Sequence, residues 1–166
     1  MAGYRLREGT ARVAERTLLR RRKKQIGISA LILLLAAQFV PVGAHNPALV
    51  PAQSIYETQP VPEAVRSIFE NSCHDCHSNR TRWPWYSHVA PVSWMIAHDV
   101  HEGRRHFNLS EWGSYSDQKK EEKLESICEQ VTNGDMPDSK YAFFHRKIRL
   151  TQDQRDAVCA WVESLR

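Results

Sequence analysis

The chain has 166 residues, of which 42% are hydrophobic and 25% are charged, and these values exclude a wholly disordered chain and a polytopic membrane protein. The net charge of +4 is unevenly spread, because residues 1–25 hold nine Lys and Arg against two Glu, whereas residues 26–166 have a net charge of −3. A main domain without a basic surface of its own is not expected to bind nucleic acid.

An uncharged stretch of nineteen residues, Ile26–Ala44, follows the basic residues. As a helix it would be roughly 28 Å long, close to the thickness of a bilayer's hydrocarbon core. Lys and Arg beside a first apolar segment stay on the cytoplasmic side. The sequence therefore predicts a basic cytoplasmic tail over 1–25 and a transmembrane signal anchor over 26–44, with the rest of the chain outside the cytoplasmic membrane. The small residues before His45 also allow a signal peptide cleaved after Ala44.

The rest of the chain is expected to be a linker followed by a helical domain. Residues 45–62 contain four prolines and no periodic pattern, which is typical of a semi-extended linker. In the domain, 63–166, apolar residues recur at helical spacing over 63–73, 91–106, 117–132 and 151–165. Asn133-Gly134 marks a helix end, and Thr151 to Gln154 has capping-box spacing. Met95 lies on an apolar helix face and is expected in the core.

The segment Cys73-His-Asp-Cys-His77 has the C-x-x-C-H pattern of covalent c-type haem attachment. Cys73 and Cys76 on one helical turn can reach the two vinyl groups of one porphyrin, and His77 is then carried to the iron. The alternatives are a thiol–disulfide pair and half of a zinc site. A thiol-redox motif would follow a strand, which the pattern does not predict. Zinc would need a second ligand pair, which Cys128 and Cys159 do not supply at their spacing of 31 residues.

Met136 is the leading candidate for the second iron ligand. It lies in the tight loop Gly134–Pro137 between two expected helices, and a soft thioether suits haem iron. The alternatives are a histidine, with His145 the first choice, and an open coordination position.

Several motifs resemble the bacterial family of haem-binding domains. The specific block runs from Asn71 to Trp112 and includes Asn-Ser-Cys-His-Asp-Cys-His-Ser-Asn, Thr-Arg-Trp-Pro-Trp-Tyr and Val-Ala-Pro-Val-Ser-Trp. The resemblance covers roughly residues 38–166. It implies a membrane-anchored, cytochrome-c-like helical domain around one covalent haem c.

The resemblance also implies particular site residues. Haem would be attached at Cys73 and Cys76 and its iron bound by His77. Met136-Pro137 matches a later Met-Pro position of the family. His145 departs from the family pattern, because Arg146 follows it where a proline is expected.

These features favour a one-electron carrier in the bacterial envelope, with a redox partner protein. The alternative is a haem enzyme, or a gas or redox sensor, with an open iron site. Residues that could serve such a site are His98, His101, Arg104 and Arg105. A non-haem thiol protein is a third possibility.

Three further groups of residues have two interpretations each. The aromatic residues of 83–94 and Trp112 could wall the haem or fill the core. Arg80, Arg82, Arg104 and Arg105 could pair with haem propionates or lie solvated on the surface. Cys128 and Cys159 could form a disulfide or remain buried thiols.

Overall fold

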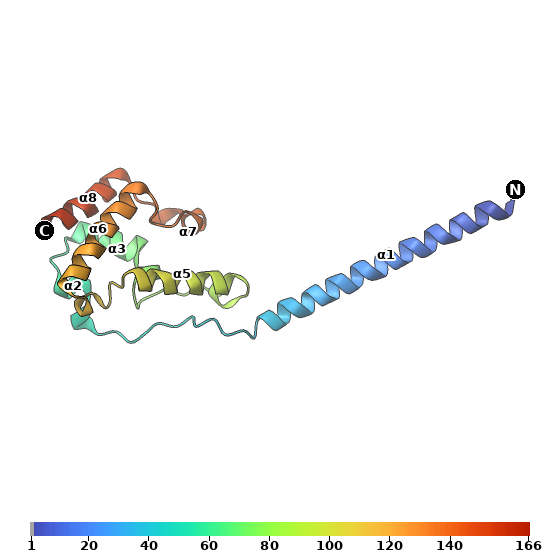
Figure 1. Ribbon diagram of the computed structural model, residues 1–166, viewed down its shortest axis with the longest axis horizontal. Coiled ribbons are helices and arrows are strands. Elements are labelled where there is room, and N and C mark those ends of the chain that lie inside the picture. Colours follow the sequence, from blue (N-terminus) through green and yellow to red (C-terminus); the bar gives the residue numbers. More distant parts are fainter. Residues whose placement is uncertain (1) are drawn as a thin grey trace.

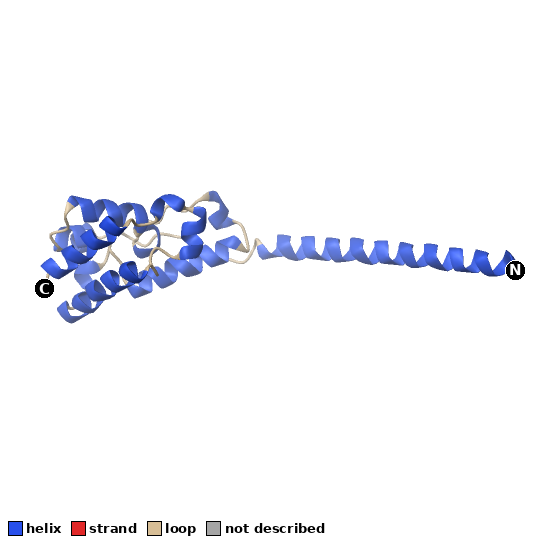
Figure 2. Cartoon of the chain, turned by 90° about the horizontal axis from the view of Figure 1, so that it is seen from above, coloured by secondary structure: helices blue, strands red, loops and turns tan. Residues whose placement is uncertain are grey.

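The computed structural model describes residues 2–166, with side chains described from residue 15 onward. This part of the chain is helical and contains no strand (Figures 1 and 2), which confirms the expected all-α class. The long first helix is α1 (Ala2–Ala37). The domain's α-helices are α2 (Ile55–Thr58), α3 (Glu63–Ser72), α4 (His74–His77), α5 (Val92–His106), α6 (Asp117–Asn133), α7 (Ser139–Phe144) and α8 (Gln152–Ser164), and its short 3-10 helices are η1 (Pro51–Gln53), η2 (Trp85–His88), η3 (Trp112–Ser114) and η4 (Arg146–Ile148).

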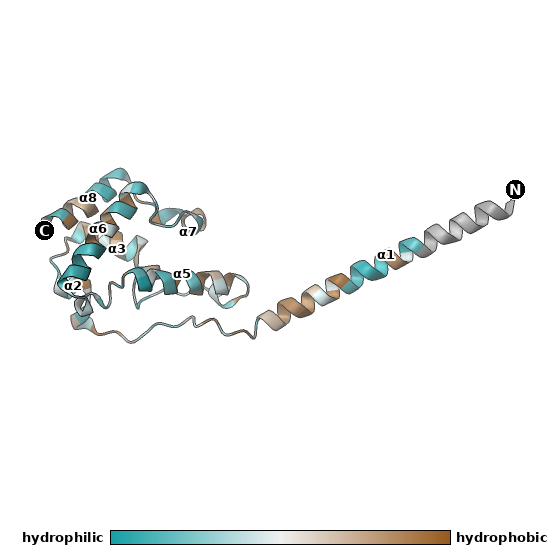
Figure 3. Cartoon of the chain, viewed as in Figure 1, coloured by the Kyte–Doolittle hydropathy of each residue, from teal (hydrophilic) through white to brown (hydrophobic). Residues whose placement is uncertain are grey.

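Helix α1 extends away from the domain as one rod (Figure 1). Its apolar half is the one nearest the domain (Figure 3). The expected helix over 26–44 does not form as one element, because α1 ends at Ala37 and residues 41–50 are irregular. Pro41 disfavours helical geometry in the residue before it, and Gly43 adopts a φ of 64°. Among the described residues, no helix meets the length and hydropathy needed to cross a membrane.

Residues 45–62, expected to be a semi-extended linker, contain η1 and α2 and are bonded to the domain. Ser54 caps the N-terminus of α2, and Ile55 is completely buried in the core. The Ile55 N–H donates to the carbonyl of Leu109 at 2.8 Å. With three and four residues, η1 and α2 are too short to show a period, so the sequence does not reveal them.

Arg104 fastens the start of this segment to the domain. Its guanidinium donates to the Ser78 carbonyl at 2.9 Å, the His45 carbonyl at 3.1 Å, and the side-chain oxygens of Asn46 and Thr81, both at 2.9 Å. The Asn46 amide in turn donates to the Thr81 carbonyl. We call these five residues the Arg104 clasp. Arg104 is therefore neither a solvated side chain nor free for a propionate.

The main core lies between α3, α6 and α8, supplemented by α2 and η3. Phe69 of α3 meets Trp161 of α8 edge to face, with ring centroids 5.5 Å apart. The predicted capping box is confirmed, because Thr151 and Gln154 exchange both bonds at the start of α8. Cys128 and Cys159 form a disulfide that links α6 to α8, which is one of the two alternatives left open by the sequence.

Helix α5 packs against α4 through its C-terminal half. Val100 is 3% exposed, whereas Met95 is 59% exposed, so the prediction of a core position for Met95 is wrong. Helical periodicity extends along the whole of α5, but α4 covers only part of the helix. The apolar face of α5 therefore continues beyond the part of the helix that α4 covers, and Met95 lies in the uncovered part.

Candidate cofactor site

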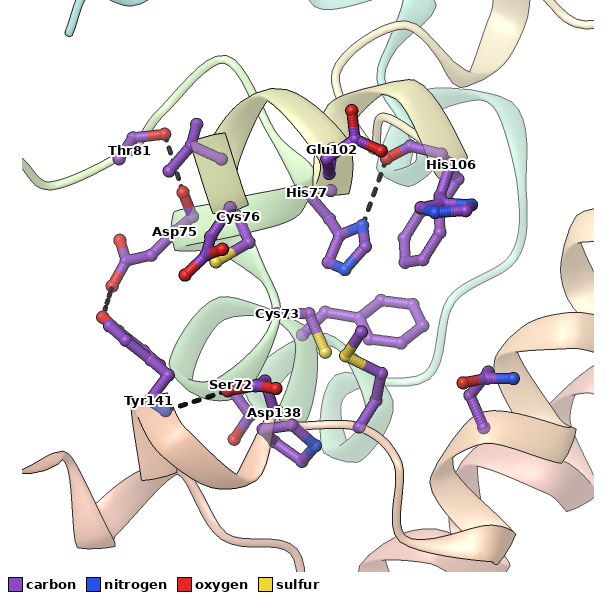
Figure 4. A pocket seen from close by; sticks show the side chains of 18 of the residues that line it. Ser72, Cys73, Asp75, Cys76, His77, Thr81, Glu102, His106, Asp138 and Tyr141 are labelled. Carbon is purple, nitrogen blue, oxygen red and sulfur yellow. Dashed lines mark hydrogen bonds between the residues drawn. The ribbon is translucent and has the colours of Figure 1, made fainter. Parts of the chain in front are cut away.

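A cavity of about 400 Å³ lies where α4, α5, α6 and the segment before α7 meet. Its volume is within the range of small-molecule and cofactor pockets. The four residues selected from the sequence, Cys73, Cys76, His77 and Met136, all line it. Figure 4 shows the labelled Cys73, Cys76 and His77 side chains around the same space.

The two thiols and the imidazole are brought together by a single helical turn. The Cys73 carbonyl accepts from the N–H of Cys76 at 3.2 Å and of His77 at 2.9 Å. These bonds close the turn and place the three side chains on one side of α4. Cys73 and Cys76 are free thiols and are not bonded to each other.

His77 has a fixed ring orientation. Its ring stacks on that of Phe107 at 4.0 Å, with 10° between the planes, and Nδ1 donates to the Phe107 carbonyl at 3.3 Å. Because Nδ1 carries the proton, Nε2 keeps its lone pair, as in a metal-ligating histidine. Burial lowers the pKa of His77 to about 4, so the imidazole is neutral at pH 7.

Gly103 allows α5 to approach the turn that carries the thiols. A Cβ at this position would lie 2.5 Å from the Cys76 carbonyl oxygen and 3.0 Å from the Cys76 Cβ. Any larger residue would therefore push α5 away from α4. The glycine serves close helix packing here, and its place inside a helical pattern was the available sequence signal.

Burial of the two thiols disfavours their thiolate form. Burial raises the pKa of Cys73 to about 12 and that of Cys76 to about 12, and the carboxylates of Asp75 and Asp99 act in the same direction on Cys76. Thiol–disulfide enzymes depend on a lowered cysteine pKa. Thiols whose pKa is raised by burial do not favour a redox dithiol.

Asp75, inside the motif, connects α4 to α7. Its carboxylate accepts from the Arg82 backbone N–H and Nε, both at 3.1 Å, and from the Tyr141 hydroxyl at 3.4 Å (Figure 4). Asp138 caps α7 by accepting from the N–H groups of Lys140 and Tyr141. Helix α7 is thereby held beside the turn that carries the thiols, and Arg82 is paired with Asp75.

Met136 is carried over the cavity by the end of α6. Gly134 adopts a φ of 79°, the left-handed geometry that ends a helix at glycine. The N–H groups of Asp135 and Met136 then both donate to the Gln130 carbonyl, at 3.0 and 3.1 Å. The predicted helix stop is thus confirmed, and the loop returns toward α4.

His145 is not among the residues that line the cavity. Its Nδ1 donates to the Tyr141 carbonyl at 3.1 Å, and its Nε2 accepts from the Tyr86 hydroxyl at 2.7 Å. Its ring also stacks on Tyr141 at 4.1 Å. Both ring nitrogens are engaged, and the side chain connects α7 to η2.

Of the two interpretations of the aromatic residues, haem wall or core, the structure supports the core for Trp112. No tryptophan lines the cavity. Trp112 is completely buried in the main core, whereas Trp85 is 78% exposed. His98 and His101 are exposed and also lie outside the cavity lining. His106, one of the histidines considered as an iron ligand, does line the cavity, whereas the sequence did not identify Gly103, Phe107 and Tyr141, whose proximity to the motif depends on tertiary contacts.

The fold and this arrangement define a small helical domain whose cavity presents two thiols, an imidazole and a thioether to a single ligand. The chain belongs to the haem-binding domain family, whose model matches residues 32–164. No curated protein and no solved structure matches the chain at a significant level.

Haem fits the residues present. His77 offers a neutral nitrogen of fixed tautomer, and Phe69, Ile96, Val100 and Val131 supply apolar walls. Within the described residues, no three His, Cys, Asp or Glu side chains are grouped to hold a metal ion by themselves. In a haem, the porphyrin nitrogens supply most of the iron's ligands, so the protein needs only the axial ones.

Proposed function

We propose that the chain binds one haem covalently through Cys73 and Cys76, with His77 and Met136 as axial ligands, and carries single electrons. The observation that carries this proposal is that all four side chains line one cavity. Bound haem would supply an iron that changes between its ferrous and ferric states. Two iron ligands supplied by His77 and Met136 would suit electron transfer, since they would leave no coordination position for a substrate.

The chain's own groups would hold the cofactor and exclude water from it. The turn of α4 holds both thiols beside the cavity, and the Phe107 carbonyl orients His77. Asp75 and the α7 cap fix the segment that carries Met136. No group in this set has to take up or release a proton for an electron to pass.

The alternative is a haem enzyme or sensor with an open iron site. His106 lines the cavity and is exposed, so a second histidine is available near a bound ligand. Against this alternative, Arg104 is engaged in the clasp and His98 and His101 lie outside the cavity. These placements favour the electron carrier.

We further propose that residues 26–44 anchor the chain in the bacterial cytoplasmic membrane, with the domain on the periplasmic side. The apolar side chains of α1 are exposed, for example Leu33 at 70%, and five basic residues, 20–24, precede them. The disulfide between Cys128 and Cys159 suits an oxidising compartment. Cleavage after Ala44 would leave the domain in the same compartment, and the mass of the mature chain distinguishes the two forms.

The covalent bond is tested with the full chain made in a strain that has a cytochrome c maturation system. We expect haem staining on a denaturing gel, a c-type pyridine haemochrome spectrum and the far-red absorption band of Met-ligated ferric haem. The double variant C73A/C76A should lose all staining, whereas the matched control C128A/C159A should keep it. Staining that survives C73A/C76A would contradict the attachment, and a spectrum without the far-red band would favour the open-site alternative.

A further inference from the structure

Apart from Leu49 and Val50, which directly precede η1, the domain exposes its large apolar side chains near one end. Beyond residue 50, every large hydrophobic side chain that is strongly exposed belongs to η2, the segment from η2 into α5, or the segment from Met136 through α7. We call six of the exposed residues near this end the aromatic end: Phe39, Trp85, Trp94, Met95, Phe143 and Phe144.

A direct contact joins the two segments of the aromatic end. The Tyr86 hydroxyl in η2 donates to His145 Nε2, directly after α7, at 2.7 Å. Figure 1 shows that α7 and the start of α5 lie at the same end of the domain, the end that faces α1. The exposed aromatic side chains of the two segments therefore belong to one end of the molecule.

The end of α1 is fastened to this same region. The Gln38 side chain forms two hydrogen bonds with the backbone of Ala90: its Oε1 accepts from the Ala90 N–H at 3.0 Å, and its Nε2 donates to the Ala90 carbonyl at 3.3 Å. Ala90 lies between η2 and α5. The exposed apolar surface of α1 is followed by Phe39, which is 88% exposed, and thus leads to the aromatic end.

Basic side chains flank the aromatic residues of α7 in the sequence, after the capping Asp138. No acidic residue occurs from 139 to 152, whereas this stretch contains the exposed residues Lys140, Arg146, Lys147 and Arg149. None of the ion pairs between described residues includes them. Exposed Trp and Phe beside Lys and Arg is the combination found where proteins meet anionic lipid headgroups.

We infer that the aromatic end rests on the headgroup layer of the membrane that α1 enters, with anionic lipid as its occupant. This inference rests on the proposed anchoring by residues 26–44. Lipid is the occupant indicated here because the apolar surface leads on from α1 and the charged side chains that follow Phe143 and Phe144 are basic. Met136 lies in the segment that leads into α7, so one mouth of the cavity would face the bilayer surface.

The test uses the full haem-loaded chain in vesicles of phosphatidylcholine and phosphatidylglycerol. Tryptophan emission is compared between vesicles with brominated acyl chains and ordinary vesicles, so that quenching by haem cancels in the ratio. We expect brominated lipid to reduce the emission of the wild type. The reduction should disappear in W85F/W94F and persist in W112F, which removes a completely buried indole.

Two outcomes overturn the inference, and they are distinguishable. If the chain floats with the vesicles but its emission is the same in both lipids, the anchor is present and the aromatic end does not touch lipid, which leaves that surface to a protein partner. If the chain does not float with the vesicles, the proposed anchoring fails and the inference fails with it.

Discussion

Replacing Gly103 with alanine tests whether the closeness of α5 to α4 builds the site. The new Cβ would lie 2.5 Å from the Cys76 carbonyl oxygen, whereas ordinary contacts begin at 3.4 Å. The two helices must therefore separate by about 0.9 Å, because the atom that obstructs the Cβ belongs to the backbone and cannot rotate away.

The size of the effect follows from two opposing contributions. Inserting a methyl group into a close contact costs about 1–3 kcal/mol, while alanine favours a helix over glycine by about 1 kcal/mol. We expect a net loss of about 1 kcal/mol in the free energy of unfolding. For a domain of this size, that corresponds to a fall of about 4–8 °C in Tm.

The assay is thermal unfolding of the haem-loaded protein, combined with its absorption spectrum. The matched control is H101A, an exposed position on the same helix, which should change stability by less than about 0.5 kcal/mol. G103A should also alter the spectrum, since moving α5 displaces the Phe107 carbonyl that orients His77. A G103A protein as stable as wild type, with an unchanged spectrum, would refute the reasoning.

Three further predictions concern the candidate ligands and the disulfide. M136A should keep its haem on a denaturing gel. It should lose the far-red band and show a lower reduction potential, because a sulfur ligand is replaced. An unchanged potential would exclude Met136 as a ligand. H145A should keep the band and the potential but lose about 1 kcal/mol of stability with its hydrogen bond to Tyr86, and loss of the band would instead indicate a histidine ligand. Reducing the Cys128–Cys159 bridge, which spans 31 residues, should lower the free energy of unfolding by about 3–4 kcal/mol. Denaturant titration with and without reductant measures this change, and equal unfolding midpoints would contradict a stabilising role.

The four helices predicted from the sequence are the ones with local signals. Periodicity and end signals such as Gly134 and Thr151 depend on neighbouring residues, so they can be recognised in a single chain. Helix α7 and the folded segment before α3 were not predicted, because elements of three to six residues contain less than two helical turns. Their structure depends on contacts with distant residues, such as the bond from Ile55 to Leu109.

The site residues also divide into those with a local sequence pattern and those placed by tertiary contacts. Cys73, Cys76 and His77 share a fixed spacing, so chemistry alone suggests their common role. Phe107 and Tyr141 contribute through the residues they contact, 30 and 66 positions away in the chain, and composition does not encode such contacts. The core position predicted for Met95 was wrong for a related reason. Periodicity shows which face of a helix is apolar, but it does not show how far along the helix the neighbouring helix extends.

The Arg104 clasp determines how far the domain could travel from an anchor. A flexible tether would let a carrier sweep a volume of space and meet distant partners. Here, residues 45 and 46 are bonded to the domain and Gln38 to Ala90, so in the proposed anchored form only a few residues separate the end of α1 from a fixed attachment. The domain would then keep a fixed position beside the membrane, and its electron-exchange partners would have to diffuse to it or be embedded beside it.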